Sequence, residues 1–360
     1  MLVWTVITFV FGILLMPLIR KLAFLVGAVD APRDRHAHIK PTATLGGLGI
    51  FISFITVFFL SPINHENTIP LLVGTLIIVV TGVIDDVKEL SPKLKLAGQV
   101  AASLCVTIWG GIMVHHIYLP FLGRVEFGYF AIPISIFWIL AIVNAINLID
   151  GIDGLAGGVS TIALVTIGGM ALLLGNTGSA FTAFLLVGAL LAFLVFNFPP
   201  ASIFMGDTGA MFVGFMIAIL SLLEFKNVTL ISLLIPIIIL GVPFTDTFFA
   251  IIRRIKQRTS ISTADRSHIH HRLLALGLTN RQTVLLLYLI AAVFSGISFL
   301  LYFSTTWGSI ILIIVLLLLI EIAVEFIGLI DENHHPLLNL YTGIGKARKK
   351  LYFRLIKRSR

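Results

Sequence analysis

The sequence predicts an all-α polytopic membrane protein with about eleven transmembrane helices. Hydrophobic residues make up 58% of the 360 residues and charged residues only 12%, whereas a soluble domain has roughly 45–50% and about 25%. The apolar residues form continuous runs, without the alternation of a membrane β-barrel. The single cysteine, Cys105, excludes a disulfide framework and any cysteine-based metal site. Together these observations exclude a soluble globular protein and a disordered chain.

Each predicted helix rests on an apolar run, because roughly 20 apolar residues are needed to cross the hydrocarbon core. The first run is followed, not preceded, by Arg20 and Lys21, so we expect an anchor with an external N-terminus rather than a cleaved signal peptide. The expected spans are 2–19, 46–60, 69–84, 95–114, 130–148, 155–174, 180–196, 204–222, 229–252, 283–302 and 306–330.

The positive charges predict the orientation of these spans. Of the 25 Lys and Arg residues, 23 fall in one set of connections and only Arg124 and Lys226 in the other, which places the C-terminus in the cytoplasm. The cytoplasmic segments are 20–45, 85–95, 149–154, 197–203, 253–282 and the basic tail 331–360. The net charge of +8 then faces anionic lipid, and no nucleic acid partner is expected. The whole chain, 1–360, is expected to form one integral-membrane domain in the cell membrane.

Acidic and amide side chains gather at the cytoplasmic ends of several predicted spans, where a charge is costly and indicates a function. They occur in GVIDDVKEL, NAINLIDGIDGLAGG, FMGDTGA and VPFTDTF, which contain Asp85, Asp86, Asn144, Asn147, Asp150, Asp153, Asp207 and Asp246. A single terminal aspartate can simply cap a helix or pair with a lysine. Acids from four spans at one depth instead indicate an assembled site on the cytoplasmic face.

The spacing within these motifs adds detail. Asn144, Asn147 and Asp150 are three residues apart and share a helix face if the helix runs that far. Asp85 and Asp86 point about 100° apart on a helix, so separate roles fit them better than joint binding of one ion. The glycines Gly151, Gly154, Gly157 and Gly158 fit either a sharp turn near a ligand or close helix packing, and both interpretations stay open.

Oxygen ligands without thiolates favour a hard cation, with Mg²⁺ the first choice and Mn²⁺ the second. Basic residues on the same face fit a pyrophosphate ligand, namely Lys40, Lys88, Lys95, Arg266 and Arg272. The segment SHIHHRL lacks the glutamate of a zincin motif. Its histidines fit contacts to phosphate or sugar, with zinc binding and a polar interfacial loop as alternatives. The chain has no P-loop motif, and GLAGG after Asp153 disfavours a CDP-alcohol phosphotransferase.

These motifs, together with KPTATLGG, occur in an order that resembles the polyprenyl-phosphate N-acetylhexosamine-1-phosphate transferases over nearly the whole chain. The His268-Ile269-His270-His271 pattern resembles the bacterial undecaprenyl-phosphate N-acetylglucosaminyl-1-phosphate transferases more than the muramoyl-pentapeptide enzymes, which carry three consecutive histidines. The resemblance implies that UDP-GlcNAc and undecaprenyl phosphate give undecaprenyl-diphospho-GlcNAc and UMP. Such a reaction begins teichoic acid, O-antigen or related polysaccharide synthesis.

The resemblance also implies a role for each motif residue. Asp207 would bind Mg²⁺ with Asn147 as a second ligand, and Asp85 and Asp86 would lie beside the attacking lipid phosphate. Asp150 and Asp153 are expected in the catalytic set with Asp85 and Asp86. Asn144 is expected to bind substrate, with Asp153 and Phe204 at the uracil. Phosphates would be held by Lys40, Lys88 and Lys95. The diphosphate or the sugar would be met by Arg266, His268, His270, His271 and Arg272, with His270 and His271 in the catalytic set.

Three alternatives remain at this level. The donor could be UDP-GalNAc or UDP-MurNAc-pentapeptide, because the pocket for the N-acetyl group is not legible in the sequence. A lipid-linked transporter would fit Glu321 and Glu325, an i, i+4 pair in the last span, but its charges should lie at the membrane midplane. A structural scaffold would not need several acidic groups at one depth. A homodimer is expected from the family alone.

Overall fold

The computed structural model describes residues 1–30, 41–61, 68–119, 123–225, 230–256 and 268–327. The chain divides into two compact units, which are described separately below. The first comprises Met1–Thr245 and Asn280–Phe303, and the second comprises Asp246–Thr279 and Ser304–Arg360. The predicted basic tail, 331–360, lies outside the described residues.

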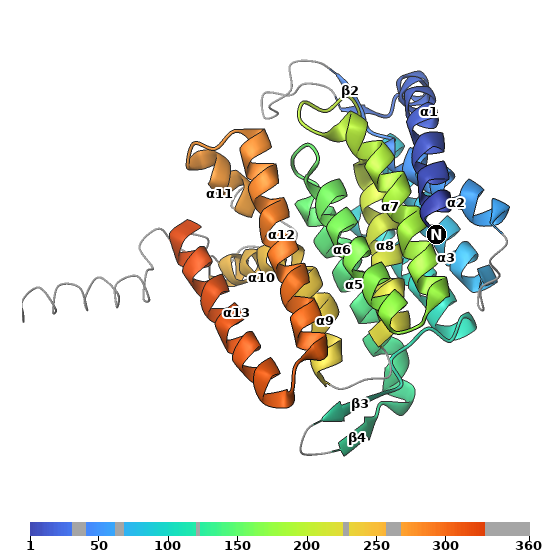
Figure 1. Cartoon of the computed structure of the whole chain (residues 1–360). Helices are drawn as coiled ribbons and strands as arrows, with labels where there is room; N and C mark the ends of the chain where they lie inside the picture. Colours follow the sequence, from blue (N-terminus) through green and yellow to red (C-terminus); the bar gives the residue numbers. More distant parts are fainter. Residues whose placement is uncertain (31–40, 62–67, 120–122, 226–229, 257–267, 328–360) are drawn as a thin grey trace, which may run out of the picture. The chain divides into compact units, whose positions relative to one another are not determined.

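Helices make up most of the first unit (Figure 1). They are α1 (Leu2–Val26), α2 (Gly46–Leu60), α3 (Thr68–Lys88), α4 (Pro92–Leu104), α5 (Ala131–Ile149), α6 (Leu155–Leu173), α7 (Thr177–Asn197), α8 (Gly206–Phe225), α9 (Leu230–Ile239) and α12 (Asn280–Phe303). Two short antiparallel pairs join them: β1 (Val29–Asp30) with β2 (Thr42–Ala43), and β3 (His116–Leu119) with β4 (Gly123–Glu126). Helix α10 (Gly241–Lys256) begins in this unit and continues into the second, which also contains α11 (Ile269–Ala275) and α13 (Thr306–Ile327).

Helix α8 lies at the centre of the first unit, where it packs against α2, α3, α5 and α6. Its most apolar window is 83% buried, whereas that of α1 is only 22% buried. A helix that is hydrophobic all round is expected in such a protein core, and a hydrophobic exposed face is expected where lipid replaces protein. Figure 1 shows the β3–β4 hairpin at the opposite end of the first unit from β2.

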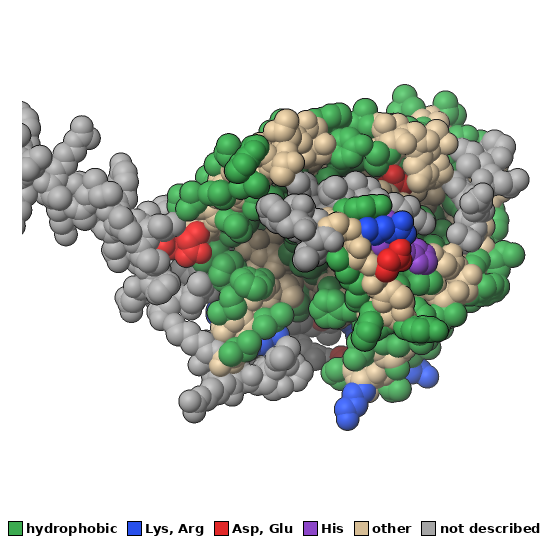
Figure 2. All heavy atoms as spheres, turned by 90° about the horizontal axis from the view of Figure 1, so that it is seen from below, with side chains coloured by type: hydrophobic (Ala, Val, Ile, Leu, Met, Phe, Trp, Pro, Cys, Tyr) green, Lys and Arg blue, Asp and Glu red, His purple; other side chains and the backbone are tan. Residues whose placement is uncertain are grey.

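Large hydrophobic side chains are exposed along several of the described helices, among them α1, α12 and α13, as contact with lipid requires. Figure 2 shows one face of the molecule on which hydrophobic side chains predominate and charged side chains are few. In the β3–β4 hairpin, Arg124 and Glu126 form an exposed ion pair at 2.6 Å. Such a surface supports the prediction of a membrane protein.

Among the described residues, eight helices are long and apolar enough to cross a membrane: α1, α3, α5 with its preceding turn, α6, α7, α8, α12 and α13. These agree with eight of the predicted spans. The predicted span 46–60 is also an apolar helix, α2, of 15 residues. The all-helical fold class is therefore confirmed in outline, apart from the two small strand pairs.

Two predicted spans differ from the observed helices. The segment predicted as a helix over 95–114 ends its helical path in a π-turn at Cys105–Trp109, and the chain then turns toward the β3–β4 hairpin. The segment predicted over 229–252 is not one continuous helix, because α9 ends at Ile239 and α10 begins at Gly241. Pro243 follows in the first turn of α10 and has no N–H to donate to the Ile239 carbonyl, which explains the break.

Candidate functional site

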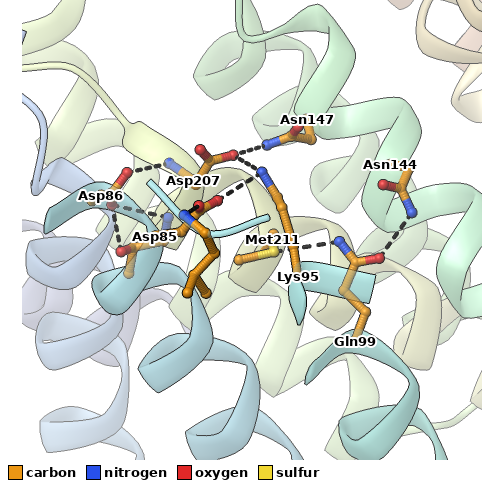
Figure 3. Close-up of polar contacts among 10 residues, drawn as sticks. Asp85, Asp86, Lys95, Gln99, Asn144, Asn147, Asp207 and Met211 are labelled. Atoms are coloured by element: carbon orange, nitrogen blue, oxygen red, sulfur yellow. Dashed lines mark hydrogen bonds and ion pairs between the residues drawn. The ribbon is translucent and has the colours of Figure 1, made fainter. Parts of the chain in front are cut away.

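Four polar side chains from four helices meet at the N-terminus of α8 (Figure 3). The Lys95 ammonium contacts Asp207 Oδ1 and lies 3.0 Å from Asp85 Oδ2. Asn147 Nδ2 donates to the same Asp207 oxygen at 2.5 Å. The structure therefore brings together residues that are more than a hundred positions apart in sequence, as the prediction of an assembled site requires.

Local structure explains how each helix presents its side chain. Asp207 lies in the first turn of α8, where free backbone N–H groups and the helix dipole favour a carboxylate. Lys95 follows the start of α4, which Ser91 caps by accepting from Leu94 N at 3.4 Å. Asp85 Oδ1 accepts from Leu90 N at 2.7 Å, which holds the connection between α3 and α4. The lysine is thus fixed between the two carboxylates.

Asp86 makes a different set of contacts from its neighbour. Its Oδ1 accepts from Asp207 N at 2.7 Å. Its Oδ2 accepts from Thr208 N at 3.1 Å and from Thr208 Oγ1 at 2.5 Å. The prediction of separate roles for Asp85 and Asp86 agrees with this geometry, because the two carboxylates serve different groups.

The glycine-containing segment at the start of α2 pairs with the residues before and at the start of α8 through main-chain hydrogen bonds. Phe204 N donates to Ala43 O at 2.7 Å, and Gly46 N donates to Phe204 O at 2.9 Å. Gly47 N donates to Met205 O at 2.8 Å, and a Cβ on Gly47 would lie 2.0 Å from Gly209 N. These glycines therefore allow α2 and α8 to approach closely.

Asn144 and Asp150 flank Asn147 in different ways. Asn144 Nδ2 donates to Gln99 Oε1 at 2.9 Å, and Gln99 Nε2 lies 3.4 Å from Met211 Sδ. Helix α5 ends at Ile149, and Asp150 is its C-terminal cap residue, with φ −77°, ψ 52° and its N–H donating to Asn147 O. Burial, followed by the nearby charges of Asp207, Asp86 and Asp153, raises the pKa of Asp150 to about 8. In the absence of a cation its carboxyl is largely protonated at neutral pH.

Two predicted cytoplasmic loops, 149–154 and 197–203, are tied together by buried hydrogen bonds. Asp153 Oδ2 accepts from Ala201 N at 2.9 Å. Asn197 Oδ1 accepts from Gly154 N at 2.8 Å, and its Nδ2 donates to Ile203 O at 2.9 Å. Asp153, which the resemblance places at the uracil, is thus held in a rigid corner of the first unit.

Residues of α12 complete this corner. Tyr288 Oη donates to Gly154 O at 2.5 Å, and Arg281 Nε donates to Pro199 O at 2.8 Å. A Cβ on Gly158 would lie 1.9 Å from the Tyr288 ring, and Gly154 has φ +80°. Both interpretations of the glycines therefore apply, each at a different residue: Gly154 makes a turn and Gly158 allows close packing.

The histidines are described within the second unit. His268 Nδ1 lies 2.9 Å from Asp246 Oδ2, and its ring stacks parallel to that of His270 at 5.8 Å. Burial, followed by the charge of His271, lowers the pKa of His270 to about 4, so this ring is neutral at physiological pH. Arg272 lies in the same short helix, α11. That this group joins the acidic residues in one site stays a prediction.

The remaining predicted residues have simple placements. Phe204 is half-buried beside the start of α8, and Lys88 is exposed at the end of α3. Lys40 and Arg266 lie outside the described residues. Sequence reasoning missed Gln99, Asn197, Arg281 and Tyr288, although buried amides in apolar helices are a usable signal.

Asp207 and Asp85 supply carboxylate oxygens, the ligand type that a hard divalent cation prefers. Among the described residues, no three His, Cys, Asp or Glu side chains are grouped so as to hold a metal ion by themselves. Mg²⁺ does not require such a group, because it commonly uses one or two protein carboxylates together with water and substrate phosphates. The position beside Asp207 Oδ1 already holds a cationic group, the Lys95 ammonium. The carboxylates therefore suit a cation, and the binding of Mg²⁺ itself stays a prediction.

Comparison with known proteins agrees with these observations. Residues 68–224 match the family model of glycosyl transferase family 4. A probable undecaprenyl-phosphate N-acetylglucosaminyl 1-phosphate transferase of Bacillus subtilis is 42% identical over 337 residues, which cover 93% of this chain and 94% of the relative. A decaprenyl-phosphate N-acetylglucosaminephosphotransferase of Mycobacterium tuberculosis is 31% identical, with 75% of each chain covered.

A more distant relative extends the pattern to a third organism. The undecaprenyl-phosphate alpha-N-acetylglucosaminyl 1-phosphate transferase of Salmonella typhimurium is 29% identical, with 80% of each chain covered. The matched region of the family model includes the site residues from Asp85 to Asp207. The chain therefore belongs to glycosyl transferase family 4, the polyprenyl-phosphate N-acetylhexosamine-1-phosphate transferases.

Proposed function

We propose that the protein transfers GlcNAc-1-phosphate from UDP-GlcNAc to undecaprenyl phosphate, giving undecaprenyl-diphospho-GlcNAc and UMP. The observation that carries this proposal is the meeting of Asp207, Asn147, Asp85 and Lys95 at the N-terminus of α8. The names of the Bacillus subtilis and Salmonella typhimurium relatives carry the same acceptor and sugar, and that of the Mycobacterium tuberculosis relative carries the same sugar with decaprenyl phosphate. The product would begin a cell-envelope polysaccharide or teichoic acid pathway.

The reaction exchanges one phosphorus–oxygen bond for another. An oxygen of the lipid phosphate attacks the β-phosphorus of the nucleotide sugar, and the bond from that phosphorus to the bridging oxygen breaks to release UMP. A bound Mg²⁺, held by Asp207 with Asn147, would neutralise charge on the diphosphate. Lys95 would bind phosphate oxygens from its position between Asp207 and Asp85, where it is already held near the metal ligand.

Asp85 acts mainly by positioning in this proposal. The second pKa of a phosphate monoester is about 6, so the lipid phosphate is largely ionised at neutral pH and needs little help from a base. Phosphoryl transfer depends chiefly on positioning and charge neutralisation. Asp85 meets that need by orienting Lys95, whose ammonium lies 3.0 Å away.

Donor recognition is assigned to the two tied loops and to the histidine group. Asp153 and Phe204 would contact the uracil from the corner that Asn197 holds together. The diphosphate and sugar would be bound by Lys88 and by the group of His268, His270, His271 and Arg272. Asp150, largely protonated without a cation, would ionise as positive charge arrives. The site would face the cytoplasm of a cell with this protein in its plasma membrane, and the protein would act there as a homodimer.

The test is UMP release by the purified protein in detergent. UDP-GlcNAc, UDP-GalNAc and UDP-MurNAc-pentapeptide are each supplied with undecaprenyl phosphate, with Mg²⁺, with Mn²⁺ or with EDTA. We expect release with UDP-GlcNAc only, dependent on both the lipid and a divalent ion, and absent in Asp207→Asn. Release with another donor instead would overturn the proposed sugar, and no release with any metal would overturn the proposed activity.

A further inference from the structure

We propose that Asp86 is a positioning residue that caps the N-terminus of α8 and thereby fixes Asp207, in place of the contact with the lipid phosphate that the family resemblance implies. This inference rests on the proposed function only in naming Asp207 as the metal ligand. The capping geometry itself stands on the described contacts, which Figure 3 shows.

The first argument is where the two carboxylate oxygens of Asp86 point. Oδ1 accepts from Asp207 N at 2.7 Å, and Oδ2 accepts from both the amide and the hydroxyl of Thr208. Both oxygens therefore face the first turn of a neighbouring helix. A helix leaves its first four N–H groups without partners inside the helix, and a carboxylate is well suited to satisfy them.

The second argument is that the first residue of α8 has no side chain that could accept hydrogen bonds from the free N–H groups of the helix. The residue at the beginning of α8 is Gly206, with φ +69°. A Cβ there would lie 2.7 Å from both oxygens of Asp86 and 2.1 Å from Thr44 O. A glycine is therefore required at this position, and the carboxylate that caps α8 comes from α3.

The third argument is the close contact between α3 and α8. A Cβ on Gly82, one turn before Asp86, would lie 2.4 Å from the Cα of Thr208. The two backbones thus approach closely at the level of the cap, so a short aspartate reaches the amides directly. The Asp207 amide is one of the capped groups. The cap therefore holds the backbone of Asp207 in place and with it the position of the Asp207 side chain.

The consequence is a division of labour between adjacent aspartates. Asp85 holds Lys95, which would contact the substrate phosphates, and Asp86 holds the backbone that carries the metal ligand. Loss of the cap should weaken metal binding without removing any ligand. If Asp86 instead acted directly in the chemistry, Mn²⁺ binding would not depend on the Thr208 hydroxyl.

The experiment measures Mn²⁺ binding by EPR and UMP release for wild type, Asp86→Asn, Thr208→Val and Thr208→Ser. Thr166→Val is the matched control, because the Thr166 hydroxyl bonds within its own helix to Ile162 O at 2.8 Å. We expect Thr208→Val to weaken Mn²⁺ binding by roughly threefold to tenfold, because Asp86 loses one hydrogen bond but keeps its two bonds to backbone N–H groups. Thr208→Ser should restore binding, and the control should match wild type.

Hydrogen exchange of the peptide that covers 205–211 gives a readout independent of activity. Asp86→Asn should increase exchange in this first turn of α8 and leave the rest of the helix protected. Unchanged exchange would overturn the inference, as would an inactive Asp86→Asn combined with wild-type Mn²⁺ binding in Thr208→Val. A wild-type protein that releases no UMP, yet shows the increase in Asp86→Asn, would overturn the proposed function and leave the cap supported.

Discussion

The carboxylate of Asp246 holds His268 at the start of a short helix, with Oδ2 2.9 Å from His268 Nδ1. Its other oxygen accepts from Ile269 N at 2.8 Å, the first N–H of α11. Because a carboxylate accepts the bond, the Nδ1 of His268 carries a proton, and its Nε2 is the nitrogen left to meet a ligand. Asp246 thus orients the ring and caps the helix at once.

Replacement of Asp246 by Asn should lower kcat/KM for UMP release by about 10- to 100-fold, the range for loss of a hydrogen bond to a charged group. An asparagine has only one side-chain oxygen and no charge, so it cannot accept from both His268 Nδ1 and Ile269 N as the carboxylate does. The His268 ring then loses its fixed orientation. The control is His268→Ala in the same background, because the two changes should not add. Additive losses in steady-state kinetics would contradict the assignment.

The buried His270 should make the protein less stable in acid. Its pKa is about 4 in the folded protein and about 6.5 when unfolded, so the unfolded chain binds more protons between these values. The stability present above pH 6.5 is therefore lost as the pH falls toward 4, by about 2 kcal/mol at pH 5. His270→Phe should remove this part of the fall in melting temperature between pH 7.5 and pH 5. An identical pH dependence in the variant would argue against a neutral buried ring.

Gly206→Ala should abolish UMP release and lower the melting temperature. Its backbone has φ +69°, and the added methyl group would meet Thr44 O and the Asp86 carboxylate. Gly175 is the matched control, since it has φ +77° but no atom within 4 Å of an added Cβ. Gly175→Ala should lower the free energy of unfolding only by about 1 kcal/mol, the cost of placing alanine in a left-handed backbone conformation. Similar losses for both variants would mean that crowding at Gly206 is unimportant.

Asn197→Leu should strongly destabilise the corner that holds Asp153. The substitution keeps the volume but leaves the Gly154 N–H and the Ile203 carbonyl without partners, at about 1–3 kcal/mol for each buried group. Asn144→Leu is the comparison, because Asn144 is exposed and its loss leaves one buried acceptor, Gln99 Oε1, without this partner. Thermal unfolding in detergent measures both, and an equal effect would show that burial of Asn197 does not matter.

Much of the fold could be predicted because a membrane imposes simple rules on sequence. Eight predicted spans coincide with long apolar helices, since each requires a continuous hydrophobic run. The break between α9 and α10 was missed because the segment holds two prolines, and only Pro243 lies at the break, whereas Pro236 lies inside α9. The β3–β4 hairpin was missed because its four-residue strands give too short a pattern.

The meeting of Asp85, Asn147 and Asp207 was predicted from their common depth, and the structure brings them together. Their individual partners could not be predicted, because they depend on how helices rotate and approach. The bond from Asn147 to Asp207 and the cap formed by Asp86 depend on close contacts among α3, α5 and α8. The end of α5 at Ile149, directly before Asp150, was likewise not fixed by the spacing of the polar residues.

The main-chain ladder between 43–47 and 204–205 has a consequence for tolerated sequence change. Amide and carbonyl groups are the same for nearly every residue, so exchanging the side chain of Thr44 leaves the register between these segments intact. Deleting one residue from this stretch would instead shift the register of all these main-chain hydrogen bonds and displace the start of α8. Natural variation at Thr44 is thus expected as substitution at constant length, whereas Gly46 and Gly47 leave no room for a Cβ.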